Sequence, residues 1–442
     1  MGRRFGTDGI RGRVGSEITV ELALALGRAV GHRFGGDGRT VVLGRDTRRS
    51  GEMLSAALTA GLTATGTDVV DLAVVTTPCL VHASFGPTFA AGIMVSASHN
   101  PAPDNGLKVV IDGRKPSDEL EDELEALIDD LFPIVERPND RLGRLRPDRG
   151  AIEAYRRHLA EAADDAFVGL RIGVDGANGS ASVIAPELFR SLGAEVTVLF
   201  DAPDGVNINA GCGSTHPERL AETVAAAGLD LGLAFDGDAD RLVAVDERGA
   251  IVDGDAIMGI VALERLAAGT LRNSVLVTTV MSNGGLERAV TQAGGRLIRT
   301  PVGDRHVFDA MEREDAAIGG EQSGHIIFRD RASTGDGLLT AIELVRSMRV
   351  AGTPLSALVD RIPRLPQVVI NSAAVRRDDW RDDHEFSGAV DRATEQMGDR
   401  GRVLVRPSGT EPKIRIMVEG DDPGEIENIA RELASLAETR LN

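Results

Sequence analysis

The chain lacks several features that would each place it in a particular class of protein. Its 442 residues include two cysteines, Cys79 and Cys212, which are too few for a disulfide framework or a structural zinc site. No uninterrupted apolar stretch approaches the length of a membrane span, and the N-terminal residues lead into no signal-peptide core. We therefore expect a protein of the reducing cytoplasm that has no membrane partner.

Positive charge is scarce as well. The 68 Asp and Glu residues outnumber the 49 Lys and Arg residues, for a formal net charge of −19. This balance argues against nucleic acid as a partner, because nucleic-acid binding relies on a basic surface. The chain also has no P-loop and no Gly-x-Gly-x-x-Gly fingerprint. An anionic ligand would need a local basic pocket here, since charges are screened over about 8–10 Å.

The length of the chain predicts several domains. About three or four are expected at typical domain size, and strands alternate with helices as in an α/β layer architecture. We expect three similar mixed α/β domains at 1–148, 149–248 and 249–363, and a C-terminal α+β lid domain at 364–442, arranged around a central cleft. The similar pattern of the first three suggests an internal repeat.

Two polar segments receive structural interpretations. Residues 133–150, with three prolines and scattered Arg and Asp, predict a linker. The helix from Ser117 carries an apolar stripe, and the acidic residues on its other face are expected to be solvated.

A short apolar run ends in small polar residues near the middle of the first domain. Residues 93–95 predict a buried strand whose end presents Ser98 and His99 to a cleft. A serine hydroxyl can carry phosphate as a stable monoester, especially beside a cation. A hydroxyl-rich turn, in which Asn100 and Asp104 accept hydrogen bonds from backbone donors, explains the segment about equally well. Spacing alone does not separate Ser98 from Ser96.

Two Gly-rich segments nearer the N-terminus carry arginines. In residues 5–12, Arg11 could grip a phosphate in a backbone that a ligand can approach closely, although a plain turn explains the glycines as well. Residues 44–51 follow a predicted strand and open a helix. Either an anion site or an ordinary helix start is reasonable there, and the helix start is slightly favoured.

Three carboxylates stand at alternate positions after another apolar strand. Asp236, Asp238 and Asp240 would repel one another without a cation, and hard oxygen ligands are those that Mg²⁺ prefers. A calcium loop competes because Glu247 stands at its twelfth position, but Arg241 occupies the place where that loop needs glycine. A solvated acidic turn is the other alternative. We expect a divalent metal site.

Two further loops have the chemistry of sugar and phosphate binding. Glu321 and Ser323, flanked by glycines, could bind sugar hydroxyls, whereas a lone histidine such as His325 is more often structural. Residues 406–412, with Arg415 close behind, combine guanidinium, hydroxyl and glycine amide groups, as a phosphate monoester requires. Hairpin or Gly-rich turns are the alternatives, and we favour the anion site.

Taken in order, the loops at Ser98, Asp236, Glu321 and Arg406 resemble those of the α-D-phosphohexomutases, one motif per domain over nearly the whole chain. Within that superfamily, residues 5–12, 204–209 and 212–216 are similar to those of the bacterial phosphoglucosamine mutases. Gly211 departs from that pattern, because a bulkier polar residue is expected before Cys212.

The resemblance implies an isomerase that interconverts glucosamine 6-phosphate and glucosamine 1-phosphate through an enzyme phosphoserine and a sugar 1,6-bisphosphate, feeding UDP-N-acetylglucosamine and cell-wall precursor synthesis. The bisphosphate would also be the activator. Ser98 would carry the phosphoryl group and, with Asp236, Asp238 and Asp240, ligate one Mg²⁺. The resemblance also assigns Arg11, His99, Lys108 and Arg241 to the transfer centre, Gly303, Asp304, Glu321 and Ser323 to the sugar, and Arg406, Ser408, Gly409, Thr410 and Arg415 to the distal phosphate. Lys108 and His325 are candidates for the general base.

Other functions remain open at this point. The sugar could be that of a phosphomannomutase or phosphoglucomutase, His99 could be the nucleophile of a phosphatase, and the chain could bind phosphosugars without turnover. The presence of Ser98 and all three aspartates argues against the last. We expect a hexosamine phosphate as the small-molecule partner and leave a homodimer open.

Overall fold

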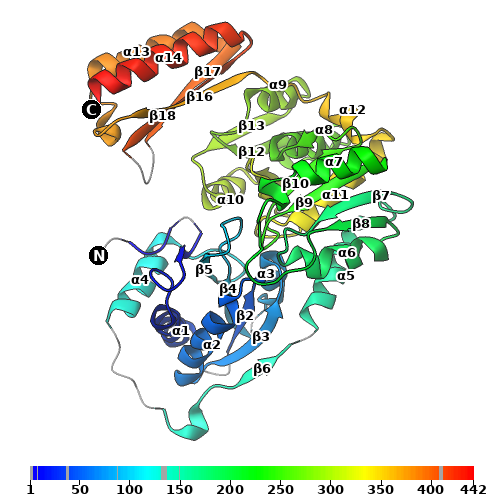
Figure 1. Cartoon of the computed structure of the whole chain (residues 1–442), viewed down its shortest axis with the longest axis vertical. Coiled ribbons are helices and arrows are strands. Elements are labelled where there is room, and N and C mark those ends of the chain that lie inside the picture. Colours follow the sequence, from blue (N-terminus) through cyan, green and yellow to red (C-terminus); the bar gives the residue numbers. More distant parts are fainter. Residues whose placement is uncertain are drawn as a thin grey trace.

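Four β-sheets follow one another along the described residues, and helices flank each of them (Figure 1). The computed structural model describes residues 3–6, 8–35, 39–86, 88–130, 137–148, 150–407 and 412–442. We call the parts built on the four sheets the first, second, third and fourth units. Within the described ranges, none of the helices combines the length and the apolar character needed to span a bilayer.

The first two units hold the N-terminal half of the chain. The strand order of the first is β1 (Ile10–Arg13), β5 (Asp104–Val110), β4 (Phe89–Val95), β2 (Thr40–Arg45), β3 (Asp68–Val74) and β6 (Leu145–Pro147), and its helices are α1 (Val20–Phe34), α2 (Ser50–Ala64), α3 (Thr77–Ala83) and α4 (Asp118–Asp129). The second has β11 (Ile251–Val252), β10 (Leu242–Asp246), β9 (Leu231–Phe235), β7 (Arg171–Asp175) and β8 (Glu195–Leu199), with α5 (Ala151–Ala163), α6 (Ala181–Ser191) and α7 (Glu218–Ala227).

The third and fourth units complete the molecule. The third has the order β13 (Arg296–Thr300), β12 (Val275–Thr279), β14 (Ile318–Gly320) and β15 (Ile326–Phe328), with α8 (Gly254–Ala267), α9 (Gly284–Gln292), α10 (Asp304–Arg313), α11 (Gly337–Ala351) and α12 (Leu355–Val359). The fourth is an antiparallel sheet of β16 (Gln367–Ala373), β18 (Lys413–Gly420) and β17 (Gly401–Pro407), covered by α13 (His384–Met397) and α14 (Pro423–Arg440).

One strand arrangement occurs in each of the first three units. A central strand (β2, β7 or β12) has a parallel neighbour on each side, and the second of these neighbours (β4, β9 or β14) pairs with an antiparallel strand (β5, β10 or β15). The internal repeat suggested by the sequence is therefore confirmed as a repeat of topology. The α/β fold class is confirmed with it.

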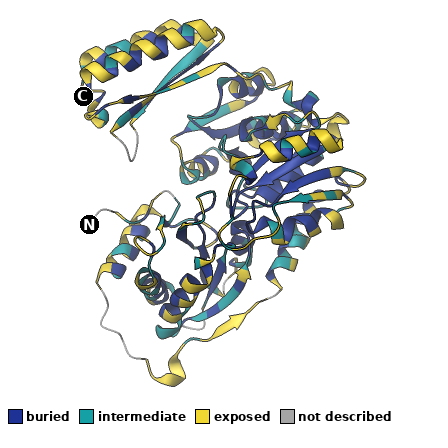
Figure 2. Cartoon of the chain, viewed as in Figure 1, coloured by how far each residue is buried: buried dark blue, intermediate teal, exposed yellow. Residues whose placement is uncertain are grey.

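The sequence predicted that residues 133–150 form a linker, but part of this segment is a β-strand. Within its described part, β6 pairs in parallel with β3 and so extends the first sheet. Arg144 anchors this edge, because its N–H donates to Asp68 Oδ1 (2.8 Å) and its carbonyl accepts from Val69 N–H (2.9 Å). All of β6 is exposed, as the yellow arrow in Figure 2 shows. An edge strand that buries neither face has no apolar alternation by which to be recognised.

The buried residues lie mainly in the sheets and on the helix faces that cover them (Figure 2). One apolar cluster runs from the first unit through the second into the third, and includes Met94, Phe235 and Ile326 close to the three site loops. The fourth unit has a core of its own around Trp380 and Phe386. The first three units therefore share a packed interior, from which the fourth is separate.

Helix caps link this core to the site. Thr76 caps α3 by accepting from Cys79 N–H, and the next residue, Thr77, donates its hydroxyl to Asp238 Oδ2 (2.5 Å). Asp336 caps α11 and accepts the hydroxyl of the buried Tyr155 (2.7 Å). Side-chain oxygens at helix starts satisfy backbone donors that have no partner within the helix. These caps hold segments of all three units next to one another.

Candidate active site

Three of the loops singled out in the sequence occupy the same place in the repeated topology. Ser98 lies in the loop from β4 to β5, Asp236 in that from β9 to β10, and Glu321 in that from β14 to β15. Each loop leaves the carboxyl end of a parallel strand, where ligand sites form in α/β sheets. The loops meet, because Ser98 Oγ lies 2.5 Å from Asp236 Oδ2 and His325 Nδ1 lies 3.7 Å from Asp240 Oδ2.

The two serines of the first loop have different surroundings. Ser96 is part of the framework, since its hydroxyl donates to Asp46 Oδ2 (2.7 Å) and accepts from Ser98 N–H (2.9 Å). Ser98 is buried, has a φ of 51° and turns its hydroxyl toward Asp236 and, at 3.3 Å, toward His99 Nδ1. A positive φ is uncommon for a residue other than glycine and is maintained only by its surroundings.

A buried arginine and an asparagine hold this loop from both sides. The guanidinium of Arg48 donates to four carbonyl oxygens of the loop, those of Ser98, Asn100, Pro101 and Asp104. Asn209, from the second unit, donates to the carbonyls of Ser98 (2.9 Å) and Asn100 (3.0 Å). The last residues of the segment 44–51 thus begin α2, as the sequence analysis favoured, and the guanidinium of Arg48 is occupied by backbone oxygens.

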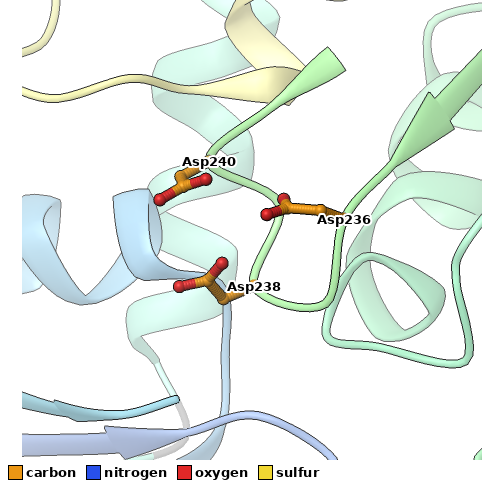
Figure 3. Close-up of side chains that lie close together, drawn as sticks. All are labelled: Asp236, Asp238 and Asp240. Atoms are coloured by element: carbon orange, nitrogen blue, oxygen red, sulfur yellow. The ribbon is translucent and has the colours of Figure 1, made fainter. Parts of the chain in front are cut away.

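The acidic loop packs directly against the serine loop. A Cβ atom on Gly237 would lie 2.6 Å from the carbonyl oxygen of Ser98, so a larger residue there would force the two loops apart. Asp236, Asp238 and Asp240 are all buried, and one oxygen of each lies within 4.8 Å of the others. Figure 3 shows the three carboxylates around one space on the loop between β9 and β10.

The acidic loop fits a divalent cation. Burial, with the charges of Asp240 and Asp238, raises the pKa of Asp236 to about 8. Among the described residues, neither Asp238 Oδ1 nor Asp240 Oδ1 has a hydrogen-bond partner, although both atoms are buried. Buried oxygens without donors are costly unless a cation binds them, and carboxylate oxygens suit Mg²⁺. The three aspartates therefore fit a site for a divalent metal ion.

Cations of the first unit surround the metal site. Lys108 Nζ lies 2.7 Å from Asp238 Oδ2, 2.9 Å from Asp8 Oδ2 and 3.5 Å from Asp240 Oδ2. Arg11 pairs with Asp8, and burial is the main reason that the pKa of Arg11 is lowered. Its Nε has no hydrogen-bond partner among the described residues. The structure thus brings Arg11 and Lys108 to the acidic loop.

His99 and Arg241 complete the neighbourhood of Ser98. Burial, followed by the positive charges of Arg241 and Arg11, lowers the pKa of His99 to about 4, so the ring is neutral at physiological pH. The Nε of Arg241 is buried and, within the described part of the chain, has no hydrogen-bond partner. Nε–H groups of arginine that have no hydrogen-bond partner among the described residues suit the oxygens of a phosphoryl group.

The predicted sugar-binding residues form one network in the third unit. Glu321 Oε1 accepts from Gly303 N–H (3.1 Å), and its Oε2 accepts from Ser323 Oγ (3.3 Å). Gly303 has a φ of 130°, which favours glycine, and it precedes α10. The loops 302–305 and 321–325 are therefore joined through the Glu321 carboxylate.

His325 is buried between two carboxylates of different units. Its Nδ1 faces Asp240, and its Nε2 lies 3.5 Å from Asp304 Oδ2 and accepts from Gly335 N–H (3.1 Å). Burial acts to lower the pKa of His325, but the charges of Asp240 and Asp304 outweigh it and raise the pKa. In the neutral ring the Gly335 bond places the remaining proton on Nδ1, toward Asp240.

The strands on either side of the predicted phosphate loop, β17 and β18, belong to the fourth unit. Arg406 and Arg415 are paired positions of β17 and β18, and burial and the charge of Arg415 lower the pKa of Arg406. Ser408, Gly409 and Thr410 lie outside the described residues. Figure 1 shows β17 and β18 standing apart from β4 and β5. No hydrogen bond or ion pair joins Arg406 or Arg415 to described residues of the other three loops.

The sequence predicted that the acidic face of α4 is solvated, but acidic residues in the first turn of this helix form ion pairs. Glu121 is buried and pairs with Arg305 of the third unit (2.6 Å) and with Arg3 (3.0 Å), and Asp118 pairs with the same two arginines. A sequence pattern does not show which acidic residues will meet a partner from a distant segment. This ion cluster joins α4 to the start of α10.

Family models cover this chain from end to end. Those described as phosphoglucomutase/phosphomannomutase alpha/beta/alpha domains I, II and III match residues 2–132, 153–249 and 253–365, and the C-terminal domain matches 369–436. The chain belongs to this family. As a phosphohexomutase it is an enzyme, an intramolecular phosphotransferase of the isomerase class.

Curated relatives of this phosphohexomutase are named phosphoglucosamine mutase. The protein of Symbiobacterium thermophilum is 51% identical with full coverage of both chains, and that of Moorella thermoacetica is 47% identical over 99% of each. The recognition of the phosphoglucosamine mutases from the motifs is therefore confirmed.

Solved structures agree on the fold. A phosphoglucomutase/phosphomannomutase family protein from Burkholderia thailandensis superposes with a TM-score of 0.85 at 28% identity, covering 100% of this chain and 99% of the other. The N-acetylphosphoglucosamine mutase of Aspergillus fumigatus, solved with GlcNAc-6P and magnesium, gives 0.67 at 18% identity, covering 99% and 96%.

Four residues of the site were missed or left without a role by the sequence analysis. Asp8 and Asn209 lie in segments that carry the family resemblance, which is a signal that could have singled them out. Arg48 and Lys115 had no such signal. Their roles depend on partners that fold back from elsewhere in the chain, namely the serine loop for Arg48 and Asp304 for Lys115.

Proposed function

We propose that this enzyme interconverts glucosamine 6-phosphate and glucosamine 1-phosphate, with Ser98 as the phosphoryl carrier and a sugar 1,6-bisphosphate as intermediate and activator. The observation that carries the proposal is the contact of Ser98 Oγ with Asp236 Oδ2 (2.5 Å) at the buried aspartate site. The names of relatives 44–51% identical over the whole chain support the amino sugar as substrate.

The reaction consists of two phosphoryl transfers. In the first, the bond from phosphorus to Ser98 Oγ breaks, a bond to the free sugar hydroxyl oxygen forms, and the hydroxyl proton passes to a base. The second transfer returns the other phosphate of the bisphosphate to Ser98 Oγ. Arg11 and Arg241 are proposed to bind the transferred oxygens, which suits their unpartnered Nε atoms. His99, neutral and next to Ser98 Oγ, is proposed to orient the hydroxyl.

Mg²⁺ would be held by Asp236, Asp238, Asp240 and the phosphorylated Ser98, and would offset charge on the transferred group. For the base, Lys108 and His325 both remain candidates. Each contacts Asp240, Lys108 from the first unit and His325 from the third.

The ends of the substrate are assigned to the other two units. Glu321 and Ser323, with the loop of Gly303 and Asp304, are proposed to bind the sugar hydroxyls. The distal phosphate is assigned to the fourth unit, through Arg406, Ser408, Gly409, Thr410 and Arg415. Because neither Arg406 nor Arg415 has a hydrogen bond or ion pair with the described residues of the other three loops, we propose that the fourth unit moves as a lid when the substrate binds.

The setting of the reaction is also a proposal. Both cysteines are free and buried, which supports a reducing compartment, and we place the enzyme in the cytoplasm. The proposed partner is a hexosamine phosphate. A homodimer remains open.

The experiment that tests the proposed function locates the phosphate. Intact mass and peptide mapping after incubation with glucosamine 1,6-bisphosphate should find one phosphate on Ser98, and Ser98→Ala should abolish both the label and turnover. The matched control is Ser96→Ala, which should keep the label at Ser98 with slower turnover, because it removes the bonds of the Ser96 hydroxyl to the Ser98 amide and to Asp46 and leaves the Ser98 hydroxyl in place.

Three results would overturn parts of this proposal. Phosphate on His99, with release of inorganic phosphate, would indicate a phosphatase. A label on Ser96 would move the carrier. Faster turnover of mannose or glucose 1-phosphate than of glucosamine 1-phosphate would change the sugar and leave the reaction intact.

A further inference from the structure

Lys115 bridges two carboxylates that belong to different units. Its Nζ lies 2.5 Å from Asp8 Oδ1 in the first unit and 2.5 Å from Asp304 Oδ2 in the third. The backbone before it is fixed by a tight turn, in which Ile111 and Arg114 exchange two N–H···O=C bonds of 2.8 and 2.9 Å. The side chain is 23% exposed, so this ion bridge is largely shielded from water.

Each of the two carboxylates also contacts a residue proposed for phosphoryl transfer. Asp8 uses its other oxygen, Oδ2, to bind Lys108 Nζ (2.9 Å), and it also pairs with Arg11. Asp304 Oδ2 lies 3.5 Å from His325 Nε2. A single carboxylate thus stands between Lys115 and each of the two candidate bases. Asp8 connects Lys115 to Lys108 of the first unit, and Asp304 connects it to His325 of the third.

The local charge explains why a cation is needed at this position. Since both carboxylate oxygens touch the same ammonium group, Asp8 and Asp304 would face each other across a gap of roughly 5 Å without it, and like charges at such a distance repel strongly when shielded from water. The carboxylates would then separate, and each would draw its own partner away from the metal site.

We propose that Lys115 is a positioning residue for phosphoryl transfer, because it fixes Asp8 and Asp304 and thereby holds Lys108 and His325 in one geometry. The inference rests on the proposed function. It predicts an effect on the chemical step, because reacting groups displaced by about 1 Å can slow a reaction by about 10²-fold.

A neighbouring ion pair offers the alternative that Lys115 merely fastens the two units together. Arg114 pairs with Glu312 of α10 at 2.8 Å, and its guanidinium lies 4.9 Å from the centre of the Phe308 ring. This pair joins the same two units from the adjacent position in the chain. Neither Arg114 nor Glu312 has a recorded contact with Lys108 or His325 among the described residues. Arg114→Met is therefore a matched control.

The test compares steady-state kinetics and single-turnover discharge of the phosphorylated enzyme in the full-length chain. Lys115→Met keeps an unbranched side chain, one atom shorter, and removes the ammonium group. We expect kcat to fall about 10- to 100-fold, with discharge of phosphoserine slowed in parallel, and the KM for glucosamine 1-phosphate to change by a smaller factor, because Asp304 also belongs to the loop assigned to the sugar. Lys115→Arg, which keeps the positive charge, should recover at least a third of the loss in kcat on a logarithmic scale. Arg114→Met should stay within about twofold of wild type.

The outcomes separate this inference from the proposed function. A wild-type enzyme that does not isomerise the sugar phosphates would overturn the function itself. If wild type is active, the positioning role is overturned when Lys115→Met keeps kcat within twofold, when Arg114→Met loses as much, or when Lys115→Arg recovers nothing. Thermal melts establish that each variant is folded. Should Lys115→Met fail to fold, Lys115→Gln takes its place with the same expected loss.

Discussion

At the scale of single residues, the position of Ser98 depends on one buried guanidinium. Arg48 and Asp46 are both fully buried as an ion pair (2.9 Å), and Asp46 also accepts the Ser96 hydroxyl that holds the Ser98 amide. Burial raises the pKa of Asp46, while Arg48 opposes this shift. Three of the four loop carbonyls that Arg48 binds have one further donor, which is Asn209 for Ser98 and Asn100 and the Asp104 N–H for Pro101. Removing Arg48 would therefore leave the buried Asp46 carboxylate without its counter-charge and would take one bond from each of the four carbonyls.

Arg48→Met should lower the free energy of unfolding by about 3 kcal/mol, the usual cost of breaking a buried ion pair, and should reduce kcat by at least about tenfold as the Ser98 loop loosens. Urea denaturation and the mutase assay measure the two effects. Arg49→Met is the control, because Arg49 is exposed and should change stability by less than about 0.5 kcal/mol. Equal stability of the two variants would show that the guanidinium does not support the loop.

At the scale of elements, the loops that carry Ser98, Asp236 and Glu321 could be singled out in the sequence because each follows an apolar strand. The strand before Asp236 is buried throughout and the strand before Ser98 is buried from its second residue on, so their runs of apolar residues are visible in the chain. The two residues that hold the Ser98 loop could not be found in this way, since Asn209 and Arg48 bond to Ser98 across 111 and 50 positions of the chain. β6 was missed because it has no buried face, so its sequence lacks the apolar run or alternation by which a strand is recognised. Local pattern reveals the strands and loops, whereas long-range partners become visible only in the folded chain.

Two helices of different units meet through a pair of histidines. His82 of α3 stacks on His158 of α5, with 4.8 Å between the ring centres, and its ring also lies 5.8 Å from that of Tyr155. Burial, followed by the proximity of His158, lowers the pKa of His82 below its ordinary value of 6.5. The unfolded chain therefore binds a proton at this residue more readily than the folded chain, and the contact should weaken as pH falls below about 6.5.

His82→Phe retains a ring for stacking and cannot be protonated. Between pH 7.5 and 5.5 the melting temperature of this variant should fall less than that of wild type, by about 1–2 °C, and the two should differ by a constant amount above pH 7. Differential scanning calorimetry measures the shift, and the exposed His384→Asn serves as control. An unchanged pH dependence in His82→Phe would mean that His82 does not titrate in this range.

At the scale of the whole molecule, the fourth unit is attached to the third through one polar contact region. Glu419 of β18 is buried, accepts from Gly284 N–H at the start of α9 (2.9 Å) and pairs with Arg402. Arg402 also donates to the carbonyls of Val280 (2.8 Å) and Ser282 (2.6 Å) in the third unit. Directional polar contacts of this kind fix the angle between two units more strictly than an apolar surface would. In this arrangement β17 and β18, which carry Arg406 and Arg415, stand apart from β4 and β5 (Figure 1).

Arg402→Met should therefore loosen the angle between the third and fourth units. A wider range of orientations in the free enzyme increases the entropy lost when the lid closes, so the KM for glucosamine 6-phosphate should rise about 3- to 10-fold while kcat changes less. Small-angle scattering should show a larger radius of gyration for the free variant and a greater decrease when the sugar phosphate binds. Arg400→Met is the matched control, because its bonds to Glu425 and Gln396 stay within the fourth unit. If both variants keep the wild-type KM and the same scattering curve, the Arg402 contacts do not set the position of the fourth unit.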